Sequence, residues 1–192
     1  MVWRLINRKP SLPKIKEKVF VICEGEGDKI YLNKVLNFYN DKYDIKIFPS
    51  NSVNLIVDQL KKVLKVNSEN KYYIFFDIDG NYKRSINKLI NELKQEGISY
   101  KGKIFFVNPI IEYLFIINKI NRHPTNFLTK EQYAPLIEKY FGIKKYEGTI
   151  KQYNEIVFQI SKETFELYIN NVSTDGNIVP SSTILDLIDE FK

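Results

Sequence analysis

The chain has 192 residues, of which 44% are hydrophobic and 27% charged, and its net charge is +6 at neutral pH. Such a chain can bury about 70% of the surface that it exposes when unfolded, so we expect a single domain with a sizeable core rather than a disordered or collagen-like protein. The single cysteine, Cys23, excludes an intramolecular disulfide and a cysteine-based metal cluster and favours the cytoplasm. The apolar runs are shorter than the ~20 residues of a membrane span, and no signal peptide is expected.

Residues 1–18 carry most of the basic excess. They hold one acidic residue, Glu17, against Arg4, Arg8, Lys9, Lys14, Lys16 and Lys18, and the rest of the chain is close to neutral. A basic segment of this kind can neutralise several phosphates of a nucleic acid. We therefore predict a basic N-terminal leader over residues 1–18, with a solubilising tail as the alternative.

Four short segments are rich in Val, Ile, Phe and Tyr, which favours strands. They are Val19–Cys23, Asp44–Phe48, Tyr72–Asp77 and Lys103–Val107. The intervening chain is long enough for crossover helices, and apolar residues recur at helical spacing over Lys29–Phe38, Val53–Val66 and Ser85–Glu96. We therefore expect an α/β fold, with a Rossmann-like, mainly parallel four-stranded sheet flanked by helices.

The pattern changes after Val107 and becomes helical. Asn108-Pro109 offers an N-cap and a first-turn proline to a helix that carries Glu112, and no later segment is predicted as a strand. Further helices are expected over Lys130–Phe141, Tyr146–Ser161 and Lys162–Asn170, and a last helix is capped by Ser181 or Ser182. The expected domains are an α/β domain over residues 19–125 and a helical extension over residues 126–192 packed on it.

Acidic residues follow two of the predicted strands. Glu24 comes directly after the first strand, and Asp77 and Asp79 end the third. Because the carboxyl ends of parallel strands lie at one edge of the sheet, we expect these three carboxylates to converge there. The Asp-x-Asp spacing directs both side chains to the same side of an extended chain, and carboxylate oxygens are ligands of Mg²⁺. The sequence thus predicts a metal site, with a polar turn closing a buried strand as the alternative.

Glu112 is a fourth acidic residue of interest, because its neighbours are apolar. A buried carboxylate there needs a partner, and the N-terminus of the helix and a metal ion are both candidates. Capping of the helix after the first strand explains Glu26 and Asp28 adequately. His123, the only histidine, falls in an expected exposed loop and receives no role.

In this order the motifs resemble the Toprim fold, the metal-dependent catalytic domain of topoisomerases, primases and several nucleases. The pairing of Glu24-Gly25 with Asp77-x-Asp79 is its signature. Further features are similar to the RloB-like and OLD-type branch of that fold, found among bacterial defence proteins. Two of them are the basic leader and Tyr31. The segment Asn108-Pro109-Ile110-Ile111-Glu112 is similar to the family's Asn-Pro-x-x-Glu motif, and Pro180-Ser181-Ser182-Thr183 is similar to its Pro-Ser-Thr segment.

Two positions depart from the family pattern. Gly27-Asp28 stands where the family usually has Thr-Glu, and Ile111-Glu112 and Tyr113 stand where it usually has Phe-Glu and Trp with a following His. These changes leave the carboxylates intact.

The resemblance implies a metal-dependent endonuclease. Asp77 and Asp79 would bind Mg²⁺ or Mn²⁺, Glu24 would act as general acid/base or as a further ligand, and Glu112 would complete the site. The implied substrate is RNA, tRNA or DNA in anti-phage defence by abortive infection. The phosphate backbone of that substrate would contact basic residues of the leader, namely Arg4, Arg8, Lys9 and Lys14. It would also contact Lys29, Lys83 and Arg84. The alternative for these three residues is that they lie on solvated helix faces.

The resemblance also bears on partners. The chain has no nucleotide-binding motif, so a separate ATPase subunit is compatible with the family, as is a homodimer, and no membrane partner is expected. A non-catalytic subunit that binds metal and nucleic acid within a defence complex is the alternative function. A haloacid-dehalogenase phosphatase is disfavoured: Phe75-Phe76-Asp77-Ile78-Asp79-Gly80 resembles its first motif, but that fold would have this motif on its first strand and a paired acidic motif downstream.

Overall fold

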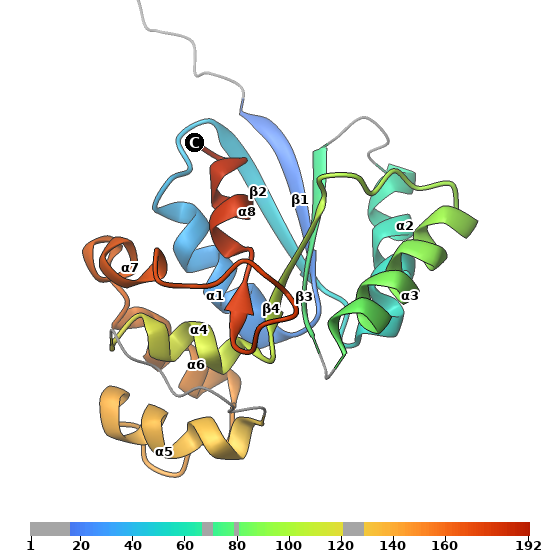
Figure 1. Ribbon diagram of the computed structural model, residues 1–192. Coiled ribbons are helices and arrows are strands. Elements are labelled where there is room, and N and C mark those ends of the chain that lie inside the picture. The colour runs from blue at the N-terminus through green and yellow to red at the C-terminus, as the bar shows by residue number, and fades with distance from the viewer. Residues whose placement is uncertain (1–15, 67–70, 79–80, 121–128) are drawn as a thin grey trace, which may run out of the picture.

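A five-stranded sheet forms the centre of the computed structural model, which describes residues 16–66, 71–78, 81–120 and 129–192 (Figure 1). Its order is β2-β1-β3-β4-β5. The strands are β1 (Glu17–Cys23), β2 (Tyr43–Pro49), β3 (Lys71–Asp77), β4 (Ile104–Asn108) and β5 (Ser181–Ser182). The first four are parallel, and β5 pairs antiparallel with β4. The α/β class and the four predicted strands are confirmed, whereas the prediction of four strands in all is wrong.

The fifth strand escapes prediction because it has only two residues and is held partly by side chains. Ser182 Oγ donates a hydrogen bond of 2.6 Å to the carbonyl of Phe106, and the Phe106 N–H donates to Thr183 Oγ1 over 2.9 Å. The segment Pro180–Thr183 thereby attaches the C-terminal part of the chain to β4. The last helix follows at once, and its N-cap is Thr183 rather than Ser181 or Ser182.

Helices account for most of the remaining described chain. They are α1 (Glu26–Asn37), a 3₁₀ turn η1 (Val53–Leu55), α2 (Ile56–Val66), α3 (Tyr82–Gln95), α4 (Ile111–Ile117), α5 (Lys130–Phe141), α6 (Ile150–Phe158), α7 (Lys162–Ile169) and α8 (Ile184–Asp189). The predicted helices are confirmed, although α6 is shorter than predicted. Gly148 has a φ of +72° and Thr149 with Gln152 forms a capping box, so the helix starts only at Ile150.

The start of α4 corrects a prediction. Asn108 does not cap this helix, because it is the last residue of β4 and pairs with Ser181. Its side chain is buried and donates a hydrogen bond of 2.9 Å to the carbonyl of Gly176. Pro109 follows through a cis peptide bond, and the N-cap is Ile110. Glu112 therefore lies within the first turn of α4.

The sheet separates two apolar cores. Alternate strand residues such as Val21 and Phe75 pack with α1, α4 and the C-terminal helices, whereas Ile22 and Ile74 pack with α2 and α3 (Figure 1). The C-terminal helices thus share a core with the α/β part. The predicted boundary at residue 125 lies outside the described residues, as do leader residues 1–15. None of the described helices has the length and apolarity that crossing a membrane requires.

This alternation places the acidic residues. Asp77 continues the row of Tyr73 and Phe75, which faces α1 and α4, whereas Glu24 follows the row of Phe20 and Ile22, which faces α2 and α3. Both residues lie at the carboxyl ends of adjacent strands, since β1 pairs directly with β3. The two carboxylates consequently reach the same edge of the sheet from opposite faces.

Candidate active site

The end of β1 is held by the loop that follows β2. The Ser50 N–H donates to the Cys23 carbonyl over 2.9 Å, and the Asn51 N–H donates to the Glu24 carbonyl over 2.7 Å. Asn51 has a φ of +68°, which brings the loop back toward β1. These bonds fix the backbone of Glu24, whose side chain then reaches the end of β3: its Oε2 accepts a hydrogen bond of 3.3 Å from the Asp77 N–H.

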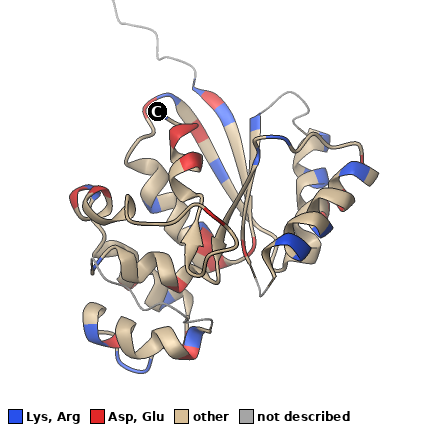
Figure 2. Ribbon diagram, viewed as in Figure 1, with Lys and Arg blue, Asp and Glu red and all other residues tan. Residues whose placement is uncertain are grey.

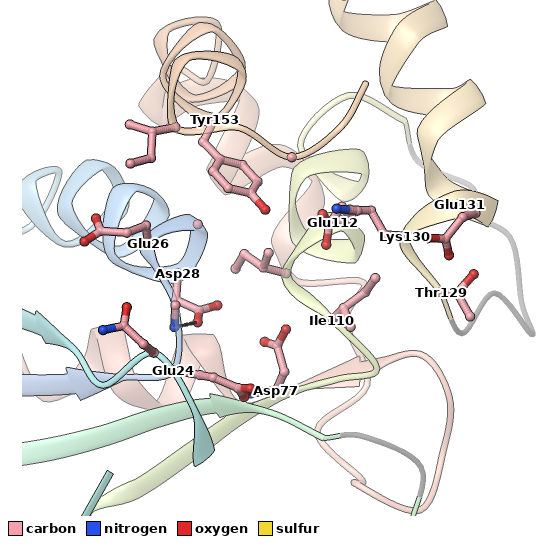
Figure 3. Close-up of a pocket in the computed structure, with 16 residues that line it drawn as sticks. Glu24, Glu26, Asp28, Asp77, Ile110, Glu112, Thr129, Lys130, Glu131 and Tyr153 are labelled. Atoms are coloured by element: carbon pink, nitrogen blue, oxygen red, sulfur yellow. Dashed lines mark hydrogen bonds between the residues drawn. The ribbon is translucent and has the colours of Figure 1, made fainter. Parts of the chain in front are cut away.

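A cavity of about 640 Å³ opens at this edge of the sheet. We call it the acidic cavity, because six carboxylates line it: Glu24 after β1, Glu26 and Asp28 of α1, Asp77 of β3, Glu112 of α4 and Glu131 of α5. Lys130 of α5 also lines it. Figure 3 shows the Asp28 and Asp77 carboxyl groups pointing toward each other, with Glu112 across the cavity and the Tyr153 hydroxyl pointing into it. The structure therefore brings together three of the predicted acidic residues and adds Asp28. The fourth predicted residue, Asp79, lies outside the described residues.

Asp28 has a strongly perturbed carboxyl group in the cavity. It is 3% exposed, and its Oδ2 accepts a hydrogen bond of 2.8 Å from the Gly25 N–H, as a capping residue does. Its Oδ1 is buried with no hydrogen-bond donor among the described residues. Burial, and then the nearby carboxylates of Glu24 and Glu112, raise the pKa of Asp28 to about 7. Crowded carboxylates of this kind favour a bound cation.

Glu112 has a protein partner. It is 3% exposed, and its Oε1 accepts a hydrogen bond of 2.8 Å from the Tyr146 hydroxyl. Burial raises the pKa of Glu112, and the hydrogen bond from Tyr146 and the charge of Lys130 oppose that shift. The expectation that a buried Glu112 needs a partner is thus met by a tyrosine from the loop before α6. A hydrogen bond also joins Tyr146 to Tyr153, which continues the network toward the cavity.

Tyr153 packs against two glycines that leave room for it. A Cβ at Gly27 would lie 3.0 Å from Tyr153 Cζ, and a Cβ at Gly148 would lie 2.8 Å from its hydroxyl oxygen. Any side chain at either position would meet the ring or its hydroxyl group. The two glycines therefore allow α1 and the loop before α6 to close around Tyr153, and this fixes one wall of the acidic cavity.

The donor set suits a hard divalent cation, since it consists of carboxylate oxygens without nearby histidine or thiolate ligands among the lining residues. Buried, crowded Asp28 supports the fit. Across residues 16–66, 71–78, 81–120 and 129–192, however, no three Asp, Glu, His or Cys side chains stand close enough together to hold a metal ion as they are. The cavity is acidic and open, and a cation would have to draw its carboxylates together.

The predicted nucleic-acid contacts are only partly within the described residues. Arg4, Arg8, Lys9 and Lys14 lie outside them, as does His123. Lys29 forms an ion pair of 3.1 Å with Glu26 beside the acidic cavity. Lys83 and Arg84 are exposed near the start of α3.

Sequence reasoning missed Asp28, Tyr146 and Tyr153 as members of the site. Asp28 does cap α1, so the capping interpretation was correct but incomplete. A signal was available, since Asp28 is four residues after Glu24 and follows a strand end. The two tyrosines come from the C-terminal part of the chain, where no motif links them to Glu112.

Comparison with known proteins adds no assignment. No protein-family model matches the chain, and no curated protein matches it. The function must therefore be argued from the motifs and from the geometry of the acidic cavity.

Proposed function

We propose that the protein is a Mg²⁺- or Mn²⁺-dependent endonuclease of the Toprim type, with its active site in the acidic cavity. The observation that carries the proposal is the convergence of Glu24, Asp28, Asp77 and Glu112 on one cavity at the carboxyl edge of the sheet. Ligands of open α/β folds bind at this edge. The raised pKa of Asp28 supports it, because such perturbed groups collect at functional sites.

Each carboxylate has a distinct role in this proposal. Asp77 and Asp28 face each other and would hold the cation, together with Asp79 on the basis of the resemblance. Glu24 is half-buried and oriented by the Asp77 N–H, which suits a general acid/base or a further ligand. Glu112, held by Tyr146, would complete the site from the opposite wall. When bound, the cation supplies charge stabilisation at a phosphoryl oxygen and lowers the pKa of a water molecule.

The wider setting that we propose is anti-phage defence, and it rests on the resemblance to RloB-like and OLD-type proteins alone. A separate ATPase subunit and a homodimer belong to the same proposal. A second candidate function is a non-catalytic subunit that binds metal and nucleic acid. One observation favours it: the described carboxylates do not form a closed ligand group.

Cleavage assays with matched variants separate these functions. Purified protein is incubated with tRNA, single-stranded RNA, plasmid and single-stranded DNA in Mg²⁺, Mn²⁺ or EDTA. Asp77→Asn should lower the cleavage rate by at least about 10²-fold, because it removes a charged ligand while keeping the shape of the side chain. Asp58→Asn, which changes an exposed carboxylate of α2, is the control and should cleave like the wild type.

Binding assays complete the test. Metal affinity is measured by Mn²⁺ titration and nucleic-acid affinity by fluorescence anisotropy of labelled oligonucleotides. Metal-dependent cleavage that Asp77→Asn abolishes supports the endonuclease. Binding of Mn²⁺ and nucleic acid without cleavage of any substrate would support the non-catalytic subunit instead, and cleavage that persists in EDTA would overturn the metal-dependent mechanism.

A further inference from the structure

A second hollow adjoins the acidic cavity on the other face of the sheet. It has a volume of about 240 Å³ and is lined by Glu24, Ser52, Val53, Asn54, Asp77, Ser85 and Lys88. We call it the α3 hollow, because Ser85 and Lys88 come from that helix and the other lining residues come from η1, the residue before it and the strand ends. Glu24 and Asp77 line both spaces, so the two spaces meet at these carboxylates.

The chemistry of the α3 hollow differs from that of the acidic cavity. Besides the two shared carboxylates, it offers an ammonium group, two hydroxyl groups and an amide, which are donors that phosphate oxygens accept from. Ser85 and Lys88 are three residues apart on α3, so they lie on one side of the helix. The ammonium of Lys88 is held toward the η1 side by a hydrogen bond to Asn54 Oδ1. This bond places the ammonium group beside the hollow.

The surroundings of the hollow are basic. Lys83 and Arg84 are exposed in the first turn of α3, and much of the Lys and Arg in this view lies along α2 and α3 (Figure 2). Four carboxylates of the acidic cavity, Glu26, Asp28, Glu112 and Glu131, do not line the hollow, whereas Glu24 and Asp77 line both spaces. A polyanion approaching the edge of the sheet meets favourable charge on the α3 side and unfavourable charge on the α1 side.

We propose that the α3 hollow binds a phosphodiester group of the substrate strand next to the one that is cleaved, with Lys88 as its anchoring cation. This inference rests on the proposed endonuclease and deepens it, since it states from which side the strand enters. The strand would cross the edge from α3 to the acidic cavity. Lys88 is then a positioning residue, which affects binding of the strand and leaves binding of the metal unchanged.

The test compares three lysine variants of the full chain. Lys88→Met removes the charge with little change of length, Lys88→Arg keeps the charge, and Lys62→Met removes the charge from an exposed lysine of α2 that lines neither space. A labelled single-stranded oligonucleotide is titrated by anisotropy in Ca²⁺ at several salt concentrations. The Mn²⁺ affinity and the thermal unfolding midpoint of each variant are measured in parallel. Both should stay near the wild-type values, because the replaced lysines are exposed.

Lys88→Met should weaken binding by about tenfold, the effect of losing one charge-assisted hydrogen bond. It should also reduce the magnitude of the slope of log K against log salt by about 0.7, the contribution of one phosphate contact on a single strand. Lys88→Arg should restore the slope, and Lys62→Met should leave both quantities near their wild-type values. In cleavage, Lys88→Met should raise KM with little change in kcat or in the Mn²⁺ affinity.

Three results overturn the inference in distinguishable ways. If the wild type binds and cleaves a strand but Lys88→Met behaves like Lys62→Met, the strand does not use the α3 hollow, and the proposed endonuclease stands. If the wild type neither binds nor cleaves any nucleic acid, the endonuclease fails and this inference fails with it. An effect of Lys88→Met on Mn²⁺ affinity equal to its effect on strand binding would also contradict a phosphate anchor.

Discussion

The Asp77 backbone N–H donates a hydrogen bond of 3.3 Å to Glu24 Oε2, which joins the ends of β3 and β1. The two residues are 53 positions apart in the chain, and parallel pairing of their strands brings them together. Glu24 therefore has two tasks at the edge of the sheet. It presents a carboxylate to the acidic cavity, and it accepts a hydrogen bond from the Asp77 backbone N–H at the end of β3.

Substitutions of Glu24 can separate these tasks. Glu24→Gln keeps an oxygen that accepts from the Asp77 N–H, so we expect cleavage to be lost while the free energy of unfolding changes by less than about 0.5 kcal/mol. Glu24→Ala removes the acceptor as well and should cost about 1 kcal/mol more. Urea unfolding of both variants, alongside the cleavage assay, measures the two effects. Equal stability of the two variants would show that this hydrogen bond contributes nothing.

Asp28→Asn tests whether Asp28 belongs to the metal site. Asp28 is buried in the acidic cavity, whereas Glu26, two residues before it, is held in an ion pair with Lys29. We expect Asp28→Asn to weaken Mn²⁺ binding by about tenfold or more and Glu26→Gln to change it by less than about twofold. Calorimetric titration measures both. The opposite ranking would place the cation at the outer rim of the cavity.

The pKa of Asp28 makes a separate prediction for the metal-free protein. Its folded-state pKa of about 7 lies above its ordinary value of 3.8, so the folded protein binds this proton more tightly than the unfolded chain does. The stabilisation is complete below the ordinary pKa and is lost as the pH rises through 7. Between pH 6 and 8, the wild type should therefore lose stability relative to Asp28→Asn, by on the order of 1 kcal/mol.

Urea unfolding in EDTA at the two pH values checks this difference. Taking the wild type relative to Asp28→Asn cancels the contributions of groups that do not interact with Asp28, and it leaves the titration of Asp28 together with its coupling to Glu24 and Glu112. Parallel pH dependence of the two proteins would mean that Asp28 is ionised throughout. In that case the crowding of carboxylates would be weaker than the geometry indicates.

Tyr146→Phe should destabilise the protein through Glu112. The change removes a hydrogen-bond donor from a buried carboxylate, which should lower the free energy of unfolding by about 1 to 3 kcal/mol. The control is Tyr168→Phe, at a half-buried tyrosine of α7 that does not line the cavity, and it should lower the free energy of unfolding by less. Adding Glu112→Gln to Tyr146→Phe should recover part of the loss, because the group left without a donor is then uncharged. Additive effects of the two substitutions would contradict a direct interaction.

The sequence could predict the fold to the extent that local patterns determine it. The strands ending at Cys23 and Asp77 are continuous apolar runs, and the converging acidic residues follow from parallel pairing. Two kinds of feature were out of reach. β5 has no pattern of its own, because its hydrogen bonds to β4 come partly from the hydroxyls of Ser182 and Thr183. The contact of Tyr146 with Glu112 depends on how the C-terminal helices pack, which side-chain periodicity does not specify.

Asp28 illustrates a third kind of limit. Its residue type and place are explained by a helix cap, and in the sequence only its spacing from Glu24 points to a second role. Only burial beside Glu24 and Glu112 reveals that the capping carboxylate is also part of the acidic cavity. A residue can thus satisfy a local rule and belong to a site at the same time.

Gly148 and Gly142 allow a matched test of the wall formed by Tyr153. Their φ angles are nearly equal, +72° and +71°, so replacing either by Ala imposes the same backbone strain of about 1 kcal/mol. A Cβ at Gly142 meets nothing within 4 Å, whereas a Cβ at Gly148 would lie 2.8 Å from the Tyr153 hydroxyl and 3.2 Å from Lys130. Gly148→Ala should therefore be more destabilising than Gly142→Ala by about 1 to 2 kcal/mol.

The same pair should differ in activity. Displacing Tyr153 disturbs the hydrogen bonds that link its hydroxyl through Tyr146 to Glu112. Gly148→Ala should therefore reduce Mn²⁺ affinity and cleavage. Gly142→Ala should leave both unchanged once its lower stability is taken into account. Urea unfolding and Mn²⁺ titration measure the two effects on the same preparations. Equal stability of the two variants would mean that Tyr153 moves aside without cost, and the ring would then not fix the wall of the acidic cavity.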